Sequence, residues 1–276
     1  MYSKRVKSRP YDEVSATIKA VAKPLLETGD EYHITHAARL AYTLEVLYRE
    51  GVAEGGRVLE LGTTGFFPIA VESLFPGVAI DVTNFDGAWA LIESFVKDPV
   101  SQVVCELAGK SAAVTAFSID LEYDVIPAED ETYDVVLCCE VLEHMEIDPM
   151  HMLSEVNRVL KTGGKLIMTT PNILSSQAWA KMLAGYAPHF FMQYHKSREY
   201  HRHNYEYGVR EVHNILTSAG FDPKIWTKDL FEDGFPAVVK SLTDAGFHIE
   251  NVGDNIIAVA TKVSGVVERF PHGLYV

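Results

Sequence analysis

Short apolar runs that alternate with helical stretches are the feature of this sequence that most constrains its fold. The runs have the length of strands, and several end on an acidic residue, a glycine or a proline. The expected strands cover residues 57–61, 78–85, 114–119, 133–139, 164–170, 221–227 and 255–261. The expected helices between them cover residues 68–74, 88–96, 150–160, 210–219 and 236–245. Such alternation predicts an α/β, doubly wound, mostly parallel seven-stranded sheet with helices on both faces.

The first part of the chain has a different pattern. Apolar residues recur at helical spacing over residues 14–50, and three glycines at 51, 55 and 56 then interrupt the pattern. We therefore expect a helical extension over residues 1–54 that caps the site. A single domain over residues 55–276 follows, with a substrate-binding insertion at about 173–209.

Composition excludes several classes of protein. The formal net charge is −14, so a phosphate backbone would be repelled and nucleic acid is not an expected partner. Three cysteines are too few for a disulfide framework. No window approaches the roughly 20 apolar residues of a membrane helix, and no secretory signal follows the basic N-terminus. These features favour a cytoplasmic protein without a membrane partner.

Acidic residues stand at or just beyond three of the expected strand ends: Glu60, Asp86 and Asp120. Ligands of open α/β sheets bind beyond the carboxyl ends of the strands. A carboxylate after the second strand can accept two hydrogen bonds from a ribose diol, and one after the third can accept from an adenine amino group. Gly62 lets the backbone approach a ligand closely.

These residues belong to a pattern that resembles the class I S-adenosylmethionine-dependent methyltransferases, which have a Rossmann-like fold. The resemblance covers about residues 55–262, and its motifs are Val58-Leu59-Glu60-Leu61-Gly62, Asp86, Asp120-Leu121, Tyr133-Asp134-Val135-Val136, Glu140-Val141-Leu142-Glu143-His144, the run 158–164 and Thr170-Pro171-Asn172. It implies that Asp86 holds the ribose, that Asp120 and Leu121 hold the adenine, and that the Gly62 loop lies along the methionine part. The implied cofactor-binding residues are Glu60, Gly62, Thr63, Thr64, Gly65, Asp86, Asp120, Leu121 and Cys138.

The glycine loop departs from the family pattern, because Thr64 and Phe66 occupy the later glycine positions. Binding of NAD by a Rossmann-type site is the alternative hypothesis for the cofactor, and the absence of a G-x-G-x-x-G turn disfavours it. A cofactor-binding regulatory subunit without catalysis stays open for the same reason.

The motif from Glu140 to His144 carries the expected chemistry. On a helical turn, positions i, i+3 and i+4 share a face, so Glu140, Glu143 and His144 would converge. Two carboxylates and an imidazole need a counter-charge, which a divalent cation can supply. The alternative is a metal-free motif in which Glu143 and His144 are ordinary family residues.

A fourth ligand is expected from residues 186–207, which hold four histidines and five tyrosines. The arrangement is similar to that of small-RNA 2′-O-methyltransferases, where an E-x-x-E-H turn and a later histidine hold magnesium. The resemblance implies a metal site of Glu140, Glu143, His144 and His203, with His201 and then His195 as alternatives to His203. Mg²⁺ suits these ligands, and Mn²⁺ or Zn²⁺ would also fit.

The region from Cys138 onward most resembles bacterial methyltransferases that modify sugars, including those of methylmannose polysaccharide synthesis. It implies a metal-assisted O-methyltransferase for a sugar or glycoside, with His144 and Glu143 as catalytic residues. His144 could be a ligand or a base. The alternatives are an RNA 2′-O-methyltransferase and an O-methyltransferase for a phenol or quinone precursor, whose family has a related E-x-x-E-H turn. A homodimer is left open.

Overall fold

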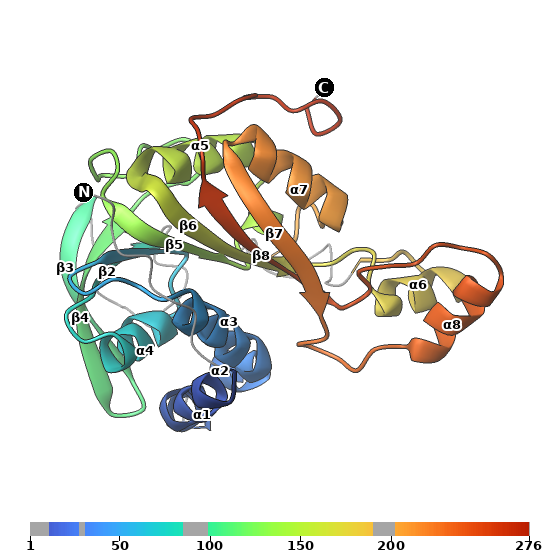
Figure 1. Ribbon diagram of the computed structural model, residues 1–276, viewed down its shortest axis with the longest axis horizontal. Coiled ribbons are helices and arrows are strands. Elements are labelled where there is room, and N and C mark those ends of the chain that lie inside the picture. Colours follow the sequence, from blue (N-terminus) through green and yellow to red (C-terminus); the bar gives the residue numbers. More distant parts are fainter. Residues whose placement is uncertain (1–10, 28–30, 85–98, 190–201, 276) are drawn as a thin grey trace.

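The protein is described from a computed structural model, which covers residues 11–27, 31–84, 99–189 and 202–275 (Figure 1). The helices are α1 (Tyr11–Glu27), α2 (Glu31–Thr35), α3 (Ala37–Glu50), α4 (Phe66–Leu74), α5 (Pro149–Val159), α6 (Ser176–Leu183), α7 (Val209–Ser218) and α8 (Pro236–Asp244), with a 3₁₀ turn at Leu142–His144. The strands are β1 (Arg57–Leu61), β2 (Ala79–Asn84), β3 (Val100–Leu107), β4 (Lys110–Ser118), β5 (Tyr133–Cys139), β6 (Leu160–Pro171), β7 (Phe221–Lys228) and β8 (Asn255–Lys262). The helix expected at 88–96 lies outside the described residues.

These strands form one sheet in the order β3-β4-β2-β1-β5-β6-β8-β7. The five central strands are parallel, whereas β3, β8 and their neighbours pair in antiparallel fashion. The predicted α/β, Rossmann-like sheet is confirmed, but the expected count of seven strands is wrong, because the described residues alone form a sheet of eight. The additional strand, β3, pairs with β4 through a tight turn at Ala108 and Gly109, both with positive φ. An Ala-Gly turn lacks the usual Asn-Gly or Asp-Gly signal of such a hairpin.

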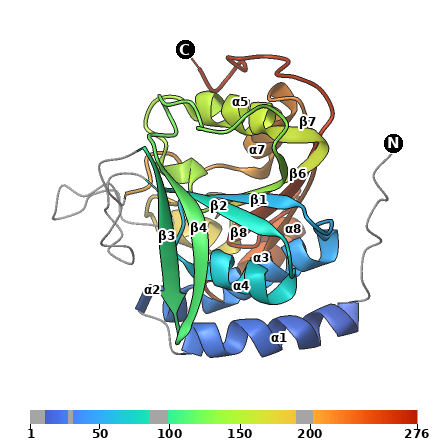
Figure 2. The ribbon, with the colours of Figure 1, turned by 90° about the vertical axis from the view of Figure 1, so that its left-hand side faces the viewer.

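Helices cover both faces of the sheet (Figures 1 and 2). Along β5, side chains alternate between the two faces, as the period of a strand requires. Val135, Leu137 and Cys139 pack in the core under α1, α3 and α4, whereas Val136 and Cys138 pack in the core under α5 and α7. We call these the α1–α4 core and the α5/α7 core.

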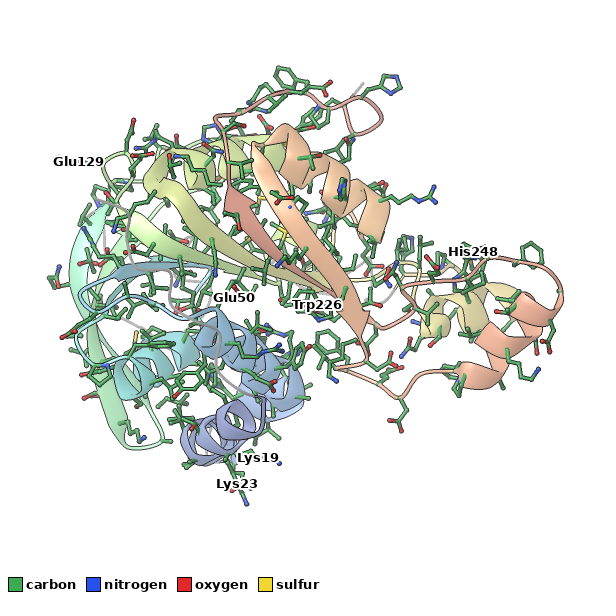
Figure 3. All side chains as sticks on the ribbon, viewed as in Figure 1. Lys19, Lys23, Glu50, Glu129, Trp226 and His248 are labelled. Atoms are coloured by element: carbon green, nitrogen blue, oxygen red, sulfur yellow. The ribbon has the colours of Figure 1, made fainter. Side chains whose placement is uncertain are left out.

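The N-terminal helices belong to the α1–α4 core. Leu40, Leu44 and Leu47 of α3 are at most 1% exposed and pack in the same cluster as Phe66 and Phe67 of α4. Two polar contacts join α3 to the sheet: Lys165 donates to Glu50, and the Trp226 indole donates to the Tyr42 hydroxyl. Figure 3 labels Glu50, at the end of α3, and Trp226 of β7.

A second group of contacts fixes the loops at the carboxyl ends of β6 and β7. The Asp254 carboxylate accepts from the backbone N–H groups of Leu230, Phe231 and Glu232. The Asn172 side chain donates to the Asn251 and Gly253 carbonyls. These bonds hold α6 and α8 beyond the end of the sheet, where the two helices pack together (Figure 1). Helix α6 lies inside the segment that the sequence assigned to an insertion. In the described part of the chain, no helix has the length and apolarity to cross a bilayer.

Because α3 shares the core of the sheet, we expect Leu44→Ala to destabilise the whole domain. Leu44 is fully buried, and truncation of such a leucine costs about 2–5 kcal/mol. Urea unfolding followed by circular dichroism measures this cost. The matched control is Ile34→Ala, since Ile34 is 57% exposed and its truncation should change stability by less than about 0.5 kcal/mol. Equal, small effects of both changes would show that α3 does not contribute to the cooperative core.

Candidate functional site

The order of the strands in the sheet places the candidate site at one edge of the sheet. The parallel strands β4, β2, β1 and β5 are neighbours in that order, so their carboxyl ends line the same edge. The connections run outward in opposite directions from β1 and β5, which makes the gap between these two strands the topological switch point where ligands bind. Glu60 and Glu140 stand at the ends of these two strands. Asp86, expected after β2, lies outside the described residues.

The loop after β1 is held by hydrogen bonds to Glu60. Thr63 Oγ1 donates to Glu60 Oε2 at 2.7 Å, and the same hydroxyl accepts from the Gly65 N–H at 3.0 Å. Gly62 has a φ of 67°, and a Cβ there would meet Val141 at 3.0 Å. The Gly62 N–H donates to Thr83 Oγ1 on β2. The loop is therefore held by the hydroxyls of Thr63 and Thr83.

Glu60 is unusual because its carboxyl group is buried. It is 2% exposed, and burial raises the pKa of Glu60 to about 7, although Thr63, Thr64 and the charge of Arg39 act in the opposite direction. The protein thus retains an acidic side chain where its ionised form is costly, as is typical of binding sites rather than of folding cores.

The other expected cofactor residues lie in two places. Asp120 follows β4, and its carboxylate accepts from the Glu122 N–H. Leu121 is partly buried against the α5/α7 core, and the thiol of Cys138 is completely buried in that core. The Thr64 hydroxyl is buried, and no described residue is its hydrogen-bond partner.

The turn after β5 does not form the helical face that the sequence analysis assumed. Glu140 has a left-handed φ of 55°, and only Leu142–His144 form a 3₁₀ turn. The Glu140 carboxylate is directed to Asn255, whose Nδ2 donates to it at 3.0 Å. Glu140 is therefore not among the residues whose ligand atoms gather at this turn, although its charge acts on Glu143.

Glu143, His144 and His203 do come together. Each offers a ligand atom, and these atoms all lie within 4.8 Å of one another. Glu143 Oε2 accepts from Thr170 Oγ1 at 2.9 Å, whereas Oε1 is buried without a hydrogen-bond partner among the described residues and lies 4.0 Å from His144 Nε2. A separation of this size between an oxygen and a nitrogen leaves room for a cation that touches both. The donor set fits a divalent metal.

The segment 202–207 brings His203 to this turn. The Asn204 N–H donates to the Glu143 carbonyl at 2.7 Å, and Asn204 Nδ2 donates to the His144 carbonyl at 2.8 Å. The rings of His144 and His203 lie edge to face with centroids 5.1 Å apart. The alternatives, His201 and His195, lie outside the described residues.

Both histidines are oriented through Nδ1. His144 Nδ1 must donate to the Arg202 carbonyl at 2.9 Å, which puts the proton on Nδ1 and makes Nε2 the basic nitrogen. His203 Nδ1 lies 2.8 Å from Oε1 of Glu206, whose side chain is fully buried. A carboxylate behind a histidine is the usual arrangement in metal sites. Sequence reasoning missed Glu206, although it stands three residues after His203.

Sequence reasoning also missed the buried cation of the site. Arg39 of α3 is 1% exposed, and its charge lowers the otherwise raised pKa values of Glu60 and Glu143. Burial, with the charge of Glu140, nonetheless raises the pKa of Glu143 well above its usual range. The signal was present: Arg39 stands next to Leu40 on the apolar stripe of a helix, where a charge is unexpected.

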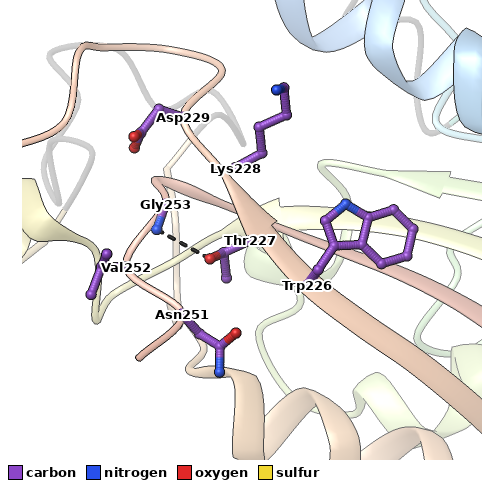
Figure 4. A pocket seen from close by; sticks show the side chains of 7 residues that line it. All are labelled: Trp226, Thr227, Lys228, Asp229, Asn251, Val252 and Gly253. Carbon is purple, nitrogen blue, oxygen red and sulfur yellow. Dashed lines mark hydrogen bonds between the residues drawn. The ribbon is translucent and has the colours of Figure 1, made fainter. Parts of the chain in front are cut away.

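A surface hollow of about 540 Å³ lies at the end of β7, between Trp226 and Gly253 (Figure 4). Two of its side chains already accept hydrogen bonds: Thr227 Oγ1 accepts from the Gly253 N–H, and Asp229 Oδ1 accepts from the Asp254 N–H. It contains none of the motif residues, so we place the candidate site at β1 and β5 instead.

Comparisons with known proteins show the family of this chain. The family described as "Methyltransferase domain" matches residues 34–224. The mitochondrial ubiquinone biosynthesis O-methyltransferase of Schizosaccharomyces pombe is 30% identical over 142 residues, which are 50% of this chain and 46% of that protein. The malonyl-[acyl-carrier protein] O-methyltransferase of Paenibacillus sp. (strain JDR-2) is 25% identical over 210 residues, which are 74% of this chain and 64% of that protein. The chain thus spans less than two thirds of the length of these curated relatives.

Solved structures share the fold. A S-adenosylmethionine-dependent methyltransferase from Archaeoglobus fulgidus superposes with a TM-score of 0.52 at 17% identity, over 85% of this chain and 95% of that chain. Another, from Thermotoga maritima, gives 0.51 at 17% identity, over 90% and 99% of the two chains.

The buried carboxyl of Glu60 predicts a pH-dependent stability. Because the pKa of Glu60 is about 7 in the folded protein, against the ordinary 4.5 of a glutamate in the unfolded chain, the folded state loses stability as pH rises through this window, by on the order of 3 kcal/mol. Glu60→Gln removes that loss, so its free energy of unfolding relative to the wild type should rise from pH 4.5 to about pH 8. Urea unfolding at both pH values measures the difference. A constant difference, like that expected for the exposed Glu129→Gln control, would contradict the prediction.

The contact between Glu206 and His203 predicts a change in metal affinity. Glu206→Gln should weaken Mn²⁺ binding roughly 10- to 100-fold, because the histidine loses the partner that fixes its tautomer. Titration calorimetry of the purified protein with Mn²⁺ measures this, and Glu129→Gln again serves as the control. Unchanged Mn²⁺ affinity would remove Glu206 from the support of the site.

Proposed function

Since the chain belongs to the family of methyltransferase domains, we propose that it transfers a methyl group from S-adenosylmethionine to a hydroxyl oxygen of a sugar or glycoside, with help from a divalent cation. One observation carries the proposal: Glu143, His144 and His203 converge at the sheet edge that also holds the Glu60 loop. A methyl donor and an acceptor hydroxyl can therefore be held side by side.

The proposed reaction is an in-line displacement. The acceptor oxygen forms a bond to the methyl carbon while the carbon–sulfur bond breaks, and the electron pair of that bond stays on sulfur. The sulfonium thus becomes the neutral thioether of S-adenosylhomocysteine. The hydroxyl proton leaves to a base. His144 Nδ1 carries a proton, so Nε2 has the only free lone pair of the ring, and it serves as the base where it does not hold the cation.

Glu143, His144 and His203 are the residues that would hold the cation. When bound, a divalent cation stabilises negative charge on the acceptor oxygen and orients an acceptor that has two adjacent oxygens. The protein's own contribution is alignment. The Thr170 hydroxyl fixes Glu143, and the Arg202 carbonyl fixes His144, so both side chains are positioned before the acceptor arrives.

A small phenolic acceptor is the second candidate, because the fungal relative is named for O-methylation in ubiquinone biosynthesis. A catechol also has two adjacent oxygens and would use the same three residues. RNA is disfavoured as the acceptor because the chain carries a net charge of −14.

We expect methyl transfer to a panel of glycosides, and loss of that transfer in EDTA. Binding of S-adenosylhomocysteine should survive EDTA, because the proposed cation touches the acceptor and not the cofactor. Transfer of a radiolabelled methyl group, with catechols and short RNA in parallel, measures acceptor class. Transfer only to catechols or to RNA would contradict a sugar or glycoside as the acceptor. Full activity in EDTA would exclude a role of a divalent cation in the reaction.

The matched variants are Glu143→Gln and His213→Ala. The first removes a ligand and should lower kcat at least about 100-fold without weakening the cofactor. The second removes an exposed histidine of α7 and should leave kcat unchanged. Equal activities of the two variants would exclude a role of Glu143 in the reaction.

A further inference from the structure

The two edges of the sheet differ in their protection against a further strand. Among the described residues, β7 and β3 are the edge strands (Figure 2). An edge strand presents unpaired N–H and C=O groups, and proteins discourage pairing there with proline or lysine. Strand β7 has both, since it contains Pro223, Lys224 and Lys228. Strand β3 has neither in its eight residues. The edge at β3 is therefore open to pairing with another strand.

The turn of the β3–β4 hairpin determines which backbone groups of β3 point outward. Leu107 and Lys110 pair across a turn of two residues, both with positive φ. The pair that closes such a turn is hydrogen-bonded, and bonded pairs alternate with pairs that are not bonded along an antiparallel ladder. Leu107 and every second residue before it thus bond to β4. The residues whose N–H and C=O groups point to the free edge are Gln102, Val104 and Glu106.

The side chains of these three residues face away from the α1–α4 core. The residues that alternate with them pack in that core: Val103, Cys105 and Leu107. Val104 is 55% exposed. Gln102 Nε2 donates to Thr115 Oγ1 of β4 at 3.0 Å on the same face. The open edge thus presents an apolar side chain between an amide and a carboxylate.

The pattern of these side chains is complementary to itself. In an antiparallel pair, the outward groups of one strand must meet the outward groups of the other. A two-fold axis at Val104 therefore sets Val104 opposite Val104 of the partner subunit and Gln102 opposite Glu106 of the partner subunit. Each carboxylate then meets an amide that can donate to it. The two carboxylates are about 14 Å apart along the strands, beyond the screening length of physiological salt.

Charge favours this register over its neighbours. An axis at Glu106 would set two carboxylates directly opposite each other, which is destabilising. An axis at Val103 would leave each carboxylate opposite Val100. The formal net charge of −14 makes two copies repel each other in general, but Glu106 is the single acidic or basic residue of β3. This edge is consequently a place where two acidic copies can approach.

We propose that two copies of this chain join through β3, antiparallel and about a two-fold axis at Val104, so that the sheet continues from one copy into the other. The interface is isologous, since the same residues serve on both sides. One pair of strands buries little surface compared with a permanent dimer, so this dimer is reversible and forms as the concentration rises. The inference does not depend on the reaction that the protein catalyses.

Light scattering over a concentration series, after gel filtration, measures the dimer. Val104→Lys should raise its dissociation constant at least about tenfold, because two lysines would stand directly opposite each other. The exposed position leaves folding intact, which circular dichroism checks. The matched control is Val125→Lys, the same change at a valine that is 62% exposed elsewhere, and it should keep the wild-type dissociation constant.

Two changes at Gln102 test the register. Gln102→Glu sets a carboxylate opposite Glu106 of the partner subunit and should weaken the dimer, whereas Gln102→Lys should strengthen it, more so at low salt. Val104→Cys should form a disulfide between the two copies on oxidation, because the Cα atoms of a hydrogen-bonded pair are about 5.5 Å apart. A non-reducing gel detects this disulfide, and Val125→Cys should stay monomeric there.

Each result decides the proposal. A wild type that stays monomeric at every concentration overturns it and leaves the edge to a strand of another protein. A dimer that persists equally in Val104→Lys overturns it by placing the contact on another surface. Equal dissociation constants of the two Gln102 variants, or equal crosslinking of Val104→Cys and Val125→Cys, would contradict the two-fold axis at Val104.

Discussion

Burial of charge at the carboxyl edge of the sheet is the constraint on which this structure depends. Glu60 and Glu143 are almost fully buried, and the pKa of each carboxyl is raised because water is excluded. Such groups are tolerated only where hydrogen bonds and opposite charges partly offset the loss of hydration. Thr63 and Thr170 supply the hydrogen bonds, and Arg39 supplies a positive charge. The site is consequently held in a state that favours cationic ligands.

This arrangement joins parts of the chain that are distant in sequence. Arg39 comes from the N-terminal helices, the two acids come from the ends of β1 and β5, and His203 comes from the segment before α7. The sheet separates them by fixed spacings, because the register of β1 with β5 pairs Leu61 with Cys138. Packing of α3 in the core and docking of residues 202–207 on Glu143 are thus conditions for the same electrostatic balance.

The sequence was informative where a residue's role is local. Near-continuous apolar runs predicted β1 and β5 to within a residue, because strands buried on both faces have little polar content. The sequence did not predict the β3–β4 hairpin, because Ala108 occupies a left-handed position of its turn that asparagine, aspartate or glycine usually occupies. The assumption of a helix at Glu140 failed for the same kind of reason, since a positive φ at a non-glycine residue leaves no clear pattern. Sequence reasoning missed Arg39 because the acidic residues that its charge affects lie far away in the sequence. It missed Glu206 because the segment 186–207 was interpreted only for its histidines and tyrosines. The resemblance to a metal-dependent family, in contrast, indicated His203.

The docking of residues 202–207 has an evolutionary consequence. Asn204 and Tyr205 donate their backbone N–H groups to the Glu143 carbonyl, and this kind of bond is retained when any residue other than proline replaces the native one. At the other end of the same connection, Ser175 caps α6 by accepting from the Ala178 N–H. With both ends anchored in this way, the residues between α6 and Arg202 can be exchanged or lengthened while the three converging side chains keep their places.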